Sequence, residues 1–186
     1  RSVEHLKAAY GELKGSDQHW LAGDVDMTDP NAVNAMAAEA HKRFGRLDGL
    51  VNTVGGFRGG KPVHEADLAE WDFMYDINVR TALNACRAVI PYMLSAQHGS
   101  IINIASLNAA QASEGFAAYC SAKAGVAMLT KVAALELGRH KVRVNAIGPG
   151  LIHTPLTEGM TAVPGLEAAF VREAPMGRAG EPEDIA

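Results

Sequence analysis

Two kinds of hydrophobic spacing alternate along the chain. Apolar residues recur every three or four positions in five segments, and this spacing predicts helices with one buried face. These segments are 2–14, 30–44, 67–75, 77–96 and 117–138. Short apolar runs lie between the helices and predict strands of a parallel sheet. These runs are 19–25, 47–56, 100–106 and 142–148. The alternation of strand and helix predicts an α/β fold, a three-layer sandwich around a parallel sheet.

Local capping residues predict where two of the helices begin or end. Asp29 is a suitable N-cap, and Pro30 suits the first helical position, where a backbone N–H has no intrahelical partner. Gly45 follows Phe44 and is expected to end that helix. Gly15 is expected to end the helix over 2–14 in the same way.

The remaining segments are expected to connect or cover the sheet. Residues 56–66 are rich in Gly and predict a loop, whereas 47–56 reads as a strand buried on both faces. Residues 151–175 mix polar and apolar positions and predict a lid with short helical pieces. Residues 180–184 have the composition of a helix start. We expect 1–186 to form a single domain.

Composition and charge exclude several classes of protein. The 186 residues, 48% of them hydrophobic, suit one domain with a sizeable core. A net charge of -4 gives no reason to expect nucleic acid or an anionic membrane as a partner. No run is long and apolar enough to span a bilayer. Cys86 and Cys120 provide no disulfide framework, so we expect a cytoplasmic location, and the seven histidines lack metal-ligand spacing, so we expect no metal.

Residues with candidate chemistry cluster between Ser106 and Lys123. Ser106 ends a predicted strand, and ligands of open α/β sheets bind beyond the carboxyl ends of strands. Tyr119 and Lys123 are four residues apart and share one face of a predicted helix, although two solvated residues have this spacing by chance as well. We expect the Lys123 ammonium to lower the pKa of Tyr119 towards neutrality. A hydroxyl beside such a phenol suits chemistry at a C–O bond.

Further motifs accompany these residues in a fixed order. They are G-D-V at 23–25, L-V-N-T-V-G-G at 50–56, Asn78 within Y-D-I-N-V, and R-V-N-A-I-G-P-G-L-I-H-T-P at 143–155. Together with Ser106, Tyr119 and Lys123 they resemble the short-chain dehydrogenase/reductase family, in the subgroup that includes 3-oxoacyl-(acyl-carrier-protein) reductases. The resemblance covers essentially the whole chain.

The resemblance implies a Rossmann-like, doubly wound parallel sheet and an NAD(P)-dependent oxidoreductase. Such an enzyme transfers hydride between a nicotinamide cofactor and a ketone or secondary alcohol, for example a 3-oxoacyl thioester. By resemblance, Tyr119 is the general acid or base and Ser106 hydrogen-bonds the reacting oxygen. Lys123 binds the nicotinamide ribose and Asn78 anchors a water in a proton relay. The lid over 151–175 then covers the substrate.

The resemblance also implies a set of cofactor-binding residues. These are Asp24, Val25, Asn52, Val54, Gly55, Tyr119, Lys123, Pro149, Gly150, Ile152 and Thr154. Three of them have structural alternatives: Asp24 as a turn residue, Asn52 as a brace where strands splay, and Thr154 as the cap of a following helix. Thr53 and Val54 depart from the Asn and Ala of the family pattern.

Two basic residues lie near the expected mouth of the site. Arg58 and Lys61 belong to the loop over 56–66 and would either meet an anionic substrate or remain solvated.

Some family segments have no counterpart in these residues. They are the first strand with its glycine-rich loop T-G-x-x-x-G-x-G, most of the second strand, and the last strand. We therefore expect a longer polypeptide, in which the strand over 47–56 is not left as an apolar edge. The missing loop would hold the pyrophosphate of NAD or NADP. Arg1 would lie near the position that selects between a 2′-hydroxyl and a 2′-phosphate, which favours NADP slightly.

Two functional hypotheses and one assembly hypothesis follow. The first function is the oxidoreductase, and the alternative is a non-catalytic relative that binds a nucleotide or a partner protein. The complete set of Asn78, Ser106, Tyr119 and Lys123 argues against the alternative, because a binding module does not need all four. The resemblance also implies a homodimer or homotetramer in which the helices over 77–96 and 117–138 pair across a two-fold axis.

Overall fold

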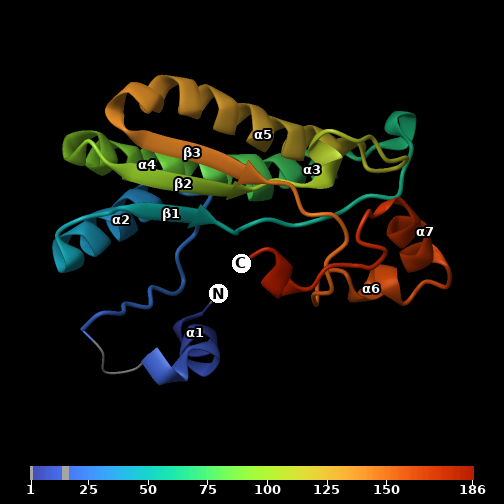
Figure 1. The fold of residues 1–186 in the computed structure, drawn as a ribbon, viewed down its shortest axis with the longest axis horizontal. Coiled ribbons are helices and arrows are strands. Elements are labelled where there is room, and N and C mark those ends of the chain that lie inside the picture. The colour runs from blue at the N-terminus through green and yellow to red at the C-terminus, as the bar shows by residue number, and fades with distance from the viewer. Residues whose placement is uncertain (1, 14–16) are drawn as a thin grey trace.

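The computed structural model describes residues 2–13 and 17–186. In these residues the sheet is parallel, with strand order β1-β2-β3. Strand β1 spans Gly49–Asn52, β2 spans Gly99–Ile104 and β3 spans Val142–Ile147. Figure 1 shows the strands side by side with their carboxyl ends at one edge, towards the C-terminal segment. The arrangement confirms the predicted α/β class with a Rossmann-like parallel sheet.

Three long helices pack against one face of this sheet (Figure 1). They are α2 (Pro30–Phe44), α4 (Thr81–Ala96) and α5 (Ala117–Leu137). The predicted ends of α2 are confirmed, since the Asp29 side chain accepts a hydrogen bond from a backbone N–H of the first turn. Gly45 closes the helix with φ 74°, a left-handed conformation that glycine adopts without strain.

The core forms where the inward side of the sheet meets these helices. Along β2, Ile101 and Asn103 are buried, whereas Ser100 and Ile102 on the opposite side are half-buried, the alternation expected of a strand. The buried cluster is drawn from all three long helices and from β2 and β3. Its members are Val33, Ala37, Ala85, Cys86, Ala88, Val89, Met93, Ile101, Ala133, Leu137, Val142 and Val144.

Strand β1 differs from the prediction of a strand buried on both faces. It lies at the edge of the described sheet, pairs only with β2 there, and leaves Val51 58% exposed. The regular strand is also shorter than the apolar run over 47–56, because the chain leaves the sheet after Asn52. The Thr53–Gly56 backbone is thereby free to form part of a site beyond the strand.

Helix α3 leads directly into α4 through a widened turn. Helix α3 spans Leu68–Tyr75 and is capped by the Asp67 side chain. A π-helical turn over Asp76–Arg80 follows, and α4 continues from it. Such turns are often found at functional sites, and Asn78 lies in this one.

The N-terminal region is less regular than predicted. Helix α1 spans only Val3–Ala9 and is followed by a 3-10 turn at Gly11–Leu13. Residues 14 and 15, the predicted end of this helix, lie outside the described residues. The strand expected over 19–25 is wrong: no strand forms there, because no other strand in the described chain pairs with this segment.

The C-terminal region beyond β3 carries short helices, as predicted for 151–175. Helix α6 spans Glu158–Thr161 and α7 spans Leu166–Glu173. Both lie beyond the carboxyl ends of the strands (Figure 1). The helix start expected at 180–184 is a single 3-10 turn at Pro182–Asp184. Over the described ranges, no helix combines the length and apolar character required to cross a bilayer.

Candidate active site

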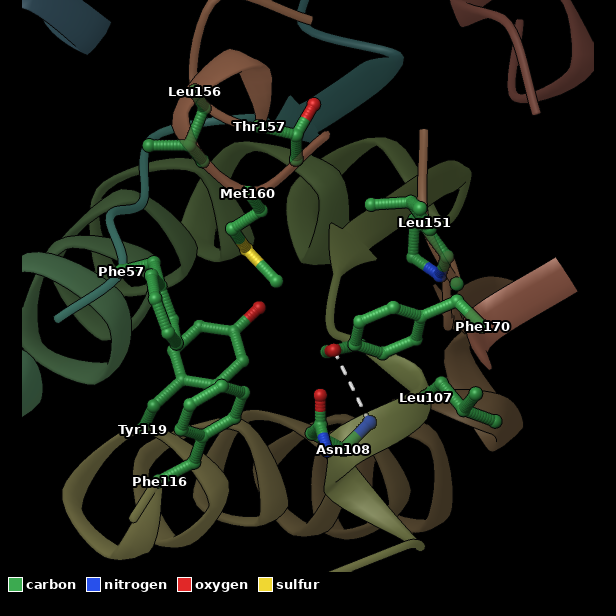
Figure 2. Close-up of a pocket in the computed structure, with 13 residues that line it drawn as sticks. Phe57, Leu107, Asn108, Phe116, Tyr119, Leu151, Leu156, Thr157, Met160 and Phe170 are labelled. Atoms are coloured by element: carbon green, nitrogen blue, oxygen red, sulfur yellow. Dashed lines mark hydrogen bonds between the residues drawn. The ribbon is translucent and has the colours of Figure 1, made fainter. Parts of the chain in front are cut away.

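Ser106 lies two residues beyond the end of β2 and opens a short 3-10 turn. Its hydroxyl oxygen accepts a hydrogen bond from the backbone N–H of Asn108 at 3.1 Å (Figure 2). This bond fixes the position of the oxygen and leaves the hydroxyl proton to be donated to another group. The prediction that Ser106 stands at a strand end is confirmed.

Tyr119 lies in the first turn of α5 and faces the same cavity as Ser106. The Phe57 ring contacts Tyr119 edge-on, with ring centroids 5.0 Å apart, and Phe57 contacts Phe116 in the same manner at 4.8 Å. Figure 2 shows the Tyr119 hydroxyl directed into the cavity. Aromatic packing therefore holds the phenol in one orientation towards the space in front of Ser106.

Lys123 is buried one helical turn after Tyr119, with 5% of its surface exposed. Its Nζ donates a hydrogen bond to the carbonyl oxygen of Ile104 at 2.9 Å and lies 5.9 Å from the centroid of the Tyr119 ring. The predicted common face of Tyr119 and Lys123 is thus present. One of the three ammonium protons is accounted for by this bond.

The electrostatics differ from the prediction for Tyr119. Burial raises the pKa of Tyr119 above its ordinary value, and a hydrogen bond with Ser106 opposes this only in part. Burial also lowers the pKa of Lys123 to about 8. The expectation that the ammonium lowers the pKa of Tyr119 is therefore wrong for this structure, because the loss of water around the phenolate outweighs the other effects.

Asn78 is almost fully buried, and its side-chain amide is bound to the backbone. Its Nδ2 donates to the carbonyl oxygens of Met74 and Gly56, both at 3.0 Å, and its Oδ1 accepts from the Gly56 N–H at 3.3 Å. Both amide protons are thus engaged. Asn78 fixes the loop that leaves β1, and the water relay expected of it stays a prediction.

Gly55 lies against Asn78 and Lys123 and has no room for a side chain. A Cβ placed there would be 2.9 Å from the Asn78 Oδ1 and 3.3 Å from the Lys123 Nζ. Val54 and Gly55 line a cavity with Val25, beyond the carboxyl end of β1. A backbone that a ligand can approach closely, beside a buried ammonium with protons to donate, fits a hydroxylated group such as a nicotinamide ribose.

Two predicted cofactor residues do not line the cavity of Val25, Val54 and Gly55. The Asn52 Nδ2 donates to the Asn103 Oδ1 at 2.8 Å, and the Asn103 Nδ2 donates to the Thr130 Oγ1 at 2.8 Å. This buried chain of hydrogen bonds favours the bracing role of Asn52. Asp24 is exposed with φ 57° and does not line the cavity that Val25 enters, a geometry that favours the turn alternative.

The predicted cofactor residues after β3 line three different cavities. Pro149 and Gly150 line the cavity of Ser106 and Tyr119, and Ile152 lines an adjoining one. Thr154 lies in a separate shallow hollow. The alternative of Thr154 as a helix cap is wrong, since the residue at the N-cap of α6 is Thr157, whose hydroxyl accepts a hydrogen bond from the Thr154 N–H.

Several cavity residues were missed by sequence reasoning. The wall is completed by residues from the loop after β1, the turn after β2, the N-cap of α5 and the lid. They are Phe57, Leu107, Asn108, Phe116, Leu151, Leu156, Thr157, Met160 and Phe170. No motif marks them. The predicted loop over 56–66 includes Phe57, and the predicted lid over 151–175 includes the last five. Arg58 is not among them, because its guanidinium lies 3.8 Å from the centre of the Phe73 ring.

Comparisons with known proteins identify the family of the chain. A family profile described as enoyl-(acyl carrier protein) reductase matches residues 2–186. The chain is 34% identical to 3-oxoacyl-(acyl-carrier-protein) reductase FabG of Thermotoga maritima, over all of this chain and 74% of that protein. A solved short-chain type dehydrogenase/reductase from Mycobacterium ulcerans superimposes with a TM-score of 0.91 and 30% identity, over 100% of this chain and 68% of that one.

Two further solved neighbours carry nicotinamide cofactors. ElxO with NADP bound has a TM-score of 0.88 and 26% identity, over 98% of this chain and 74% of that one. An NAD+-bound xylitol dehydrogenase has a TM-score of 0.76 and 28% identity, over 86% of this chain and 67% of that one. The chain therefore belongs to the short-chain dehydrogenase/reductase family of NAD(P)-dependent oxidoreductases.

Proposed function

We propose that this protein interconverts a ketone and a secondary alcohol, with Tyr119 as the proton donor or acceptor. A 3-oxoacyl thioester remains one candidate substrate, by similarity to the FabG relative. The observation that carries the proposal is the convergence of the Ser106 and Tyr119 hydroxyls on one cavity, with the buried Lys123 ammonium one helical turn away. A binding module has no need for this set, which disfavours the non-catalytic alternative.

Each residue then has a distinct task. Ser106 donates its hydroxyl proton to the reacting oxygen, and its own oxygen is held by the Asn108 N–H. Tyr119 transfers a proton to or from the same oxygen. Lys123 binds hydroxyls of the nicotinamide ribose with its remaining protons, beside Gly55. When bound, the nicotinamide cofactor supplies or accepts the hydride.

The raised pKa of Tyr119 bears on the direction of the reaction. A phenol is already protonated at neutral pH at its ordinary pKa of about 10, and burial raises the pKa of Tyr119 further. The protonated phenol is the form that donates a proton to a carbonyl oxygen. A ketone entering the site therefore meets an acid that is already protonated. We infer that reduction requires no prior ionisation of Tyr119, whereas oxidation of an alcohol requires the phenol to lose its proton first.

Tyr119→Phe tests the proposal. The ring retains its packing against Phe57 but has no proton to transfer, so turnover of ketones and alcohols should fall at least about a hundredfold. Binding of NADH and NADPH, measured by fluorescence titration, should change little. Unchanged turnover would refute the role of Tyr119, and nucleotide binding without any turnover in the parent protein would favour the non-catalytic alternative.

The finer assignments remain proposals. The slight preference for NADP was based on Arg1, which lies outside the described residues, and solved neighbours contain both NADP and NAD+. The ratio of kcat/KM with NADPH and NADH tests it.

We also propose that 151–175 is a substrate lid, since α6 and α7 contribute to the cavity wall. A cytoplasmic location agrees with the free thiols of Cys86 and Cys120.

Assembly through α4 and α5 is the last proposal. Helix α5 exposes an apolar stripe at Met128, Val132 and Leu135, with exposed fractions of 58%, 44% and 85%. These positions share one helix face, and a second copy of the chain related by a two-fold axis would cover it. We propose a homodimer, or a homotetramer that contains this dimer.

A further inference from the structure

The cavity in front of Ser106 and Tyr119 is apolar over most of its wall. The space inside it that a water-sized sphere can occupy is about 90 Å³. Phe57, Phe116 and Phe170 supply aromatic surface, and Leu156 and Met160 extend the apolar wall into the lid (Figure 2). Among the residues that the structure describes, no carboxylate, ammonium, guanidinium or imidazole group lines the cavity.

The basic residues that lie close in sequence to the cavity residues do not line the cavity. Arg58 stacks on Phe73, and Lys61 is exposed on the loop outside the wall. The Lys123 ammonium donates to the Ile104 carbonyl and is not part of the lining. A carboxylate or phosphate in this cavity would lose water without gaining a counter-ion, which is strongly unfavourable.

Asn108 places one hydrogen-bond acceptor in this apolar wall. Its Nδ2 donates to the Ser113 Oγ at 2.7 Å and to the Gln111 carbonyl oxygen at 3.2 Å. The carbonyl can only accept, so the orientation of the amide is fixed. Figure 2 shows the Asn108 Oδ1 pointing into the cavity. Over the described ranges, this oxygen has no hydrogen-bond donor of its own.

The acceptor and the Ser106 hydroxyl line the same cavity. The backbone N–H of Asn108 is bonded to the Ser106 Oγ at 3.1 Å, so both residues belong to the same short turn and the same side of the cavity. Since both residues line this cavity, a substrate whose reacting oxygen meets Ser106 can direct a group on the neighbouring carbon towards the Asn108 Oδ1. A hydroxyl or N–H on that carbon would donate to it.

We propose that the substrate is a compact, uncharged ketone or secondary alcohol with an apolar body and a second hydrogen-bond donor next to the reacting carbon, and that Asn108 recognises this donor. An α-hydroxy ketone or vicinal diol on an alicyclic ring has this form. The inference rests on the proposed function and adds the class of substrate to it.

The test compares ligands that differ in one feature. Cyclohexane-1,2-diol carries the second donor, cyclohexanol lacks the second oxygen, and 2-methoxycyclohexanol keeps the oxygen but not the donor. D-Gluconate offers many hydroxyls with a negative charge. Values of kcat/KM are measured with NAD+ and NADP+, and binding to the protein alone is followed by saturation-transfer NMR. The parent protein, Asn108→Ala and the matched loop variant Gln111→Ala are compared.

We expect the diol to exceed cyclohexanol and 2-methoxycyclohexanol about three- to tenfold in kcat/KM, the effect of one neutral hydrogen bond. Asn108→Ala should remove this preference, because it keeps the backbone N–H that holds Ser106 and loses the side-chain acceptor. Gln111→Ala should keep the preference. The methoxy compound tests the same point in the parent protein if Asn108→Ala loses its fold. Gluconate should show neither saturable turnover nor binding.

Other results separate the two proposals. Preference for gluconate, or a diol preference that persists in Asn108→Ala, would overturn the inference about the substrate while leaving the oxidoreductase intact. Binding of the diol that depends on Asn108, without turnover by either cofactor, would refute the proposed function and retain the inference. Absence of both binding and turnover of the ring compounds would overturn it.

Discussion

Replacing Lys123 with methionine should make the protein more stable at neutral pH while it loses its activity. The ammonium is 5% exposed and has one hydrogen bond, to the Ile104 carbonyl, among the described residues. Methionine has a similar length and no charge, so it fills the same space without requiring solvation. The variant therefore removes the cost of burying a charge and leaves the packing of α5 largely intact.

The size of the effect follows from the pKa of Lys123. Burial lowers that pKa from 10.5 to about 8, and each unit corresponds to about 1.4 kcal/mol, so the buried charge costs on the order of 3 kcal/mol. Loss of the hydrogen bond to Ile104 offsets about 1 kcal/mol. We expect Lys123→Met to raise the free energy of unfolding by about 2 kcal/mol near pH 7.

The pH dependence of unfolding independently checks the sign of this change in stability. Between the folded pKa of about 8 and the unfolded value of 10.5, the unfolded parent protein binds more protons than the folded one. The stability of the parent protein therefore rises with pH over this window, whereas Lys123→Met lacks this contribution. Urea unfolding of both proteins near pH 7 and near pH 9.5 should show the advantage of the variant shrinking by roughly 2 kcal/mol.

The control is Lys131→Met, which removes an exposed lysine from the same helix. It should change stability by less than about 0.5 kcal/mol, as is usual for surface substitutions. A difference between Lys123→Met and the parent protein that is the same at both pH values would refute the reasoning, because it would mean that Lys123 is not desolvated. Fluorescence titration should also show weaker NADH and NADPH binding by the variant.

Two further predictions concern the lid and the assembly. His153 bonds Glu181 at 2.8 Å and Glu167 at 3.0 Å, and these bonds raise its pKa above 6.5; their stabilisation is complete below the unfolded pKa and lost as pH rises through the folded one. As the pH rises from the unfolded pKa of His153 through its folded pKa, the Tm of the parent protein should therefore fall relative to that of His153→Gln. Curves of Tm against pH that run parallel for the two proteins would contradict this. Leu135→Glu should convert a dimer to monomers in light scattering, and an unchanged mass would exclude this face as the interface.

Elements with local signals were predicted well from the sequence. Helix α2 began and ended where Asp29, Pro30 and Gly45 indicated, because capping depends only on neighbouring residues. The strand over 19–25 was wrong for the opposite reason. Its apolar pattern is strand-like, but a strand requires a hydrogen-bonded neighbour, which a local pattern does not reveal.

The same distinction applies to the site. Tyr119 and Lys123 were predictable because helical spacing alone puts them on one face. The raised pKa of Tyr119 was not, since it depends on burial that many separate segments create. Phe57, Asn108 and Phe170 come from three distant segments that converge beyond the carboxyl ends of the strands. Their contribution to the cavity follows from topology rather than from any motif.

The polar groups around the carboxyl ends of β1 and β2 are of two kinds. We call those whose amide donors are used within the protein satisfied, and those with hydrogen-bonding capacity left over unsatisfied. Asn52, Asn103 and Asn78 donate to partners within the protein, which stabilises the sheet and the loop after it. Lys123 and the Asn108 Oδ1 differ, because each has bonding capacity directed to a cavity or beside one. The satisfied groups hold the backbone rigid, so the energetic cost of the unsatisfied groups is relieved only when a ligand supplies the missing partners. On this reasoning, affinity and selectivity depend on these two residues more than on the rest of the wall.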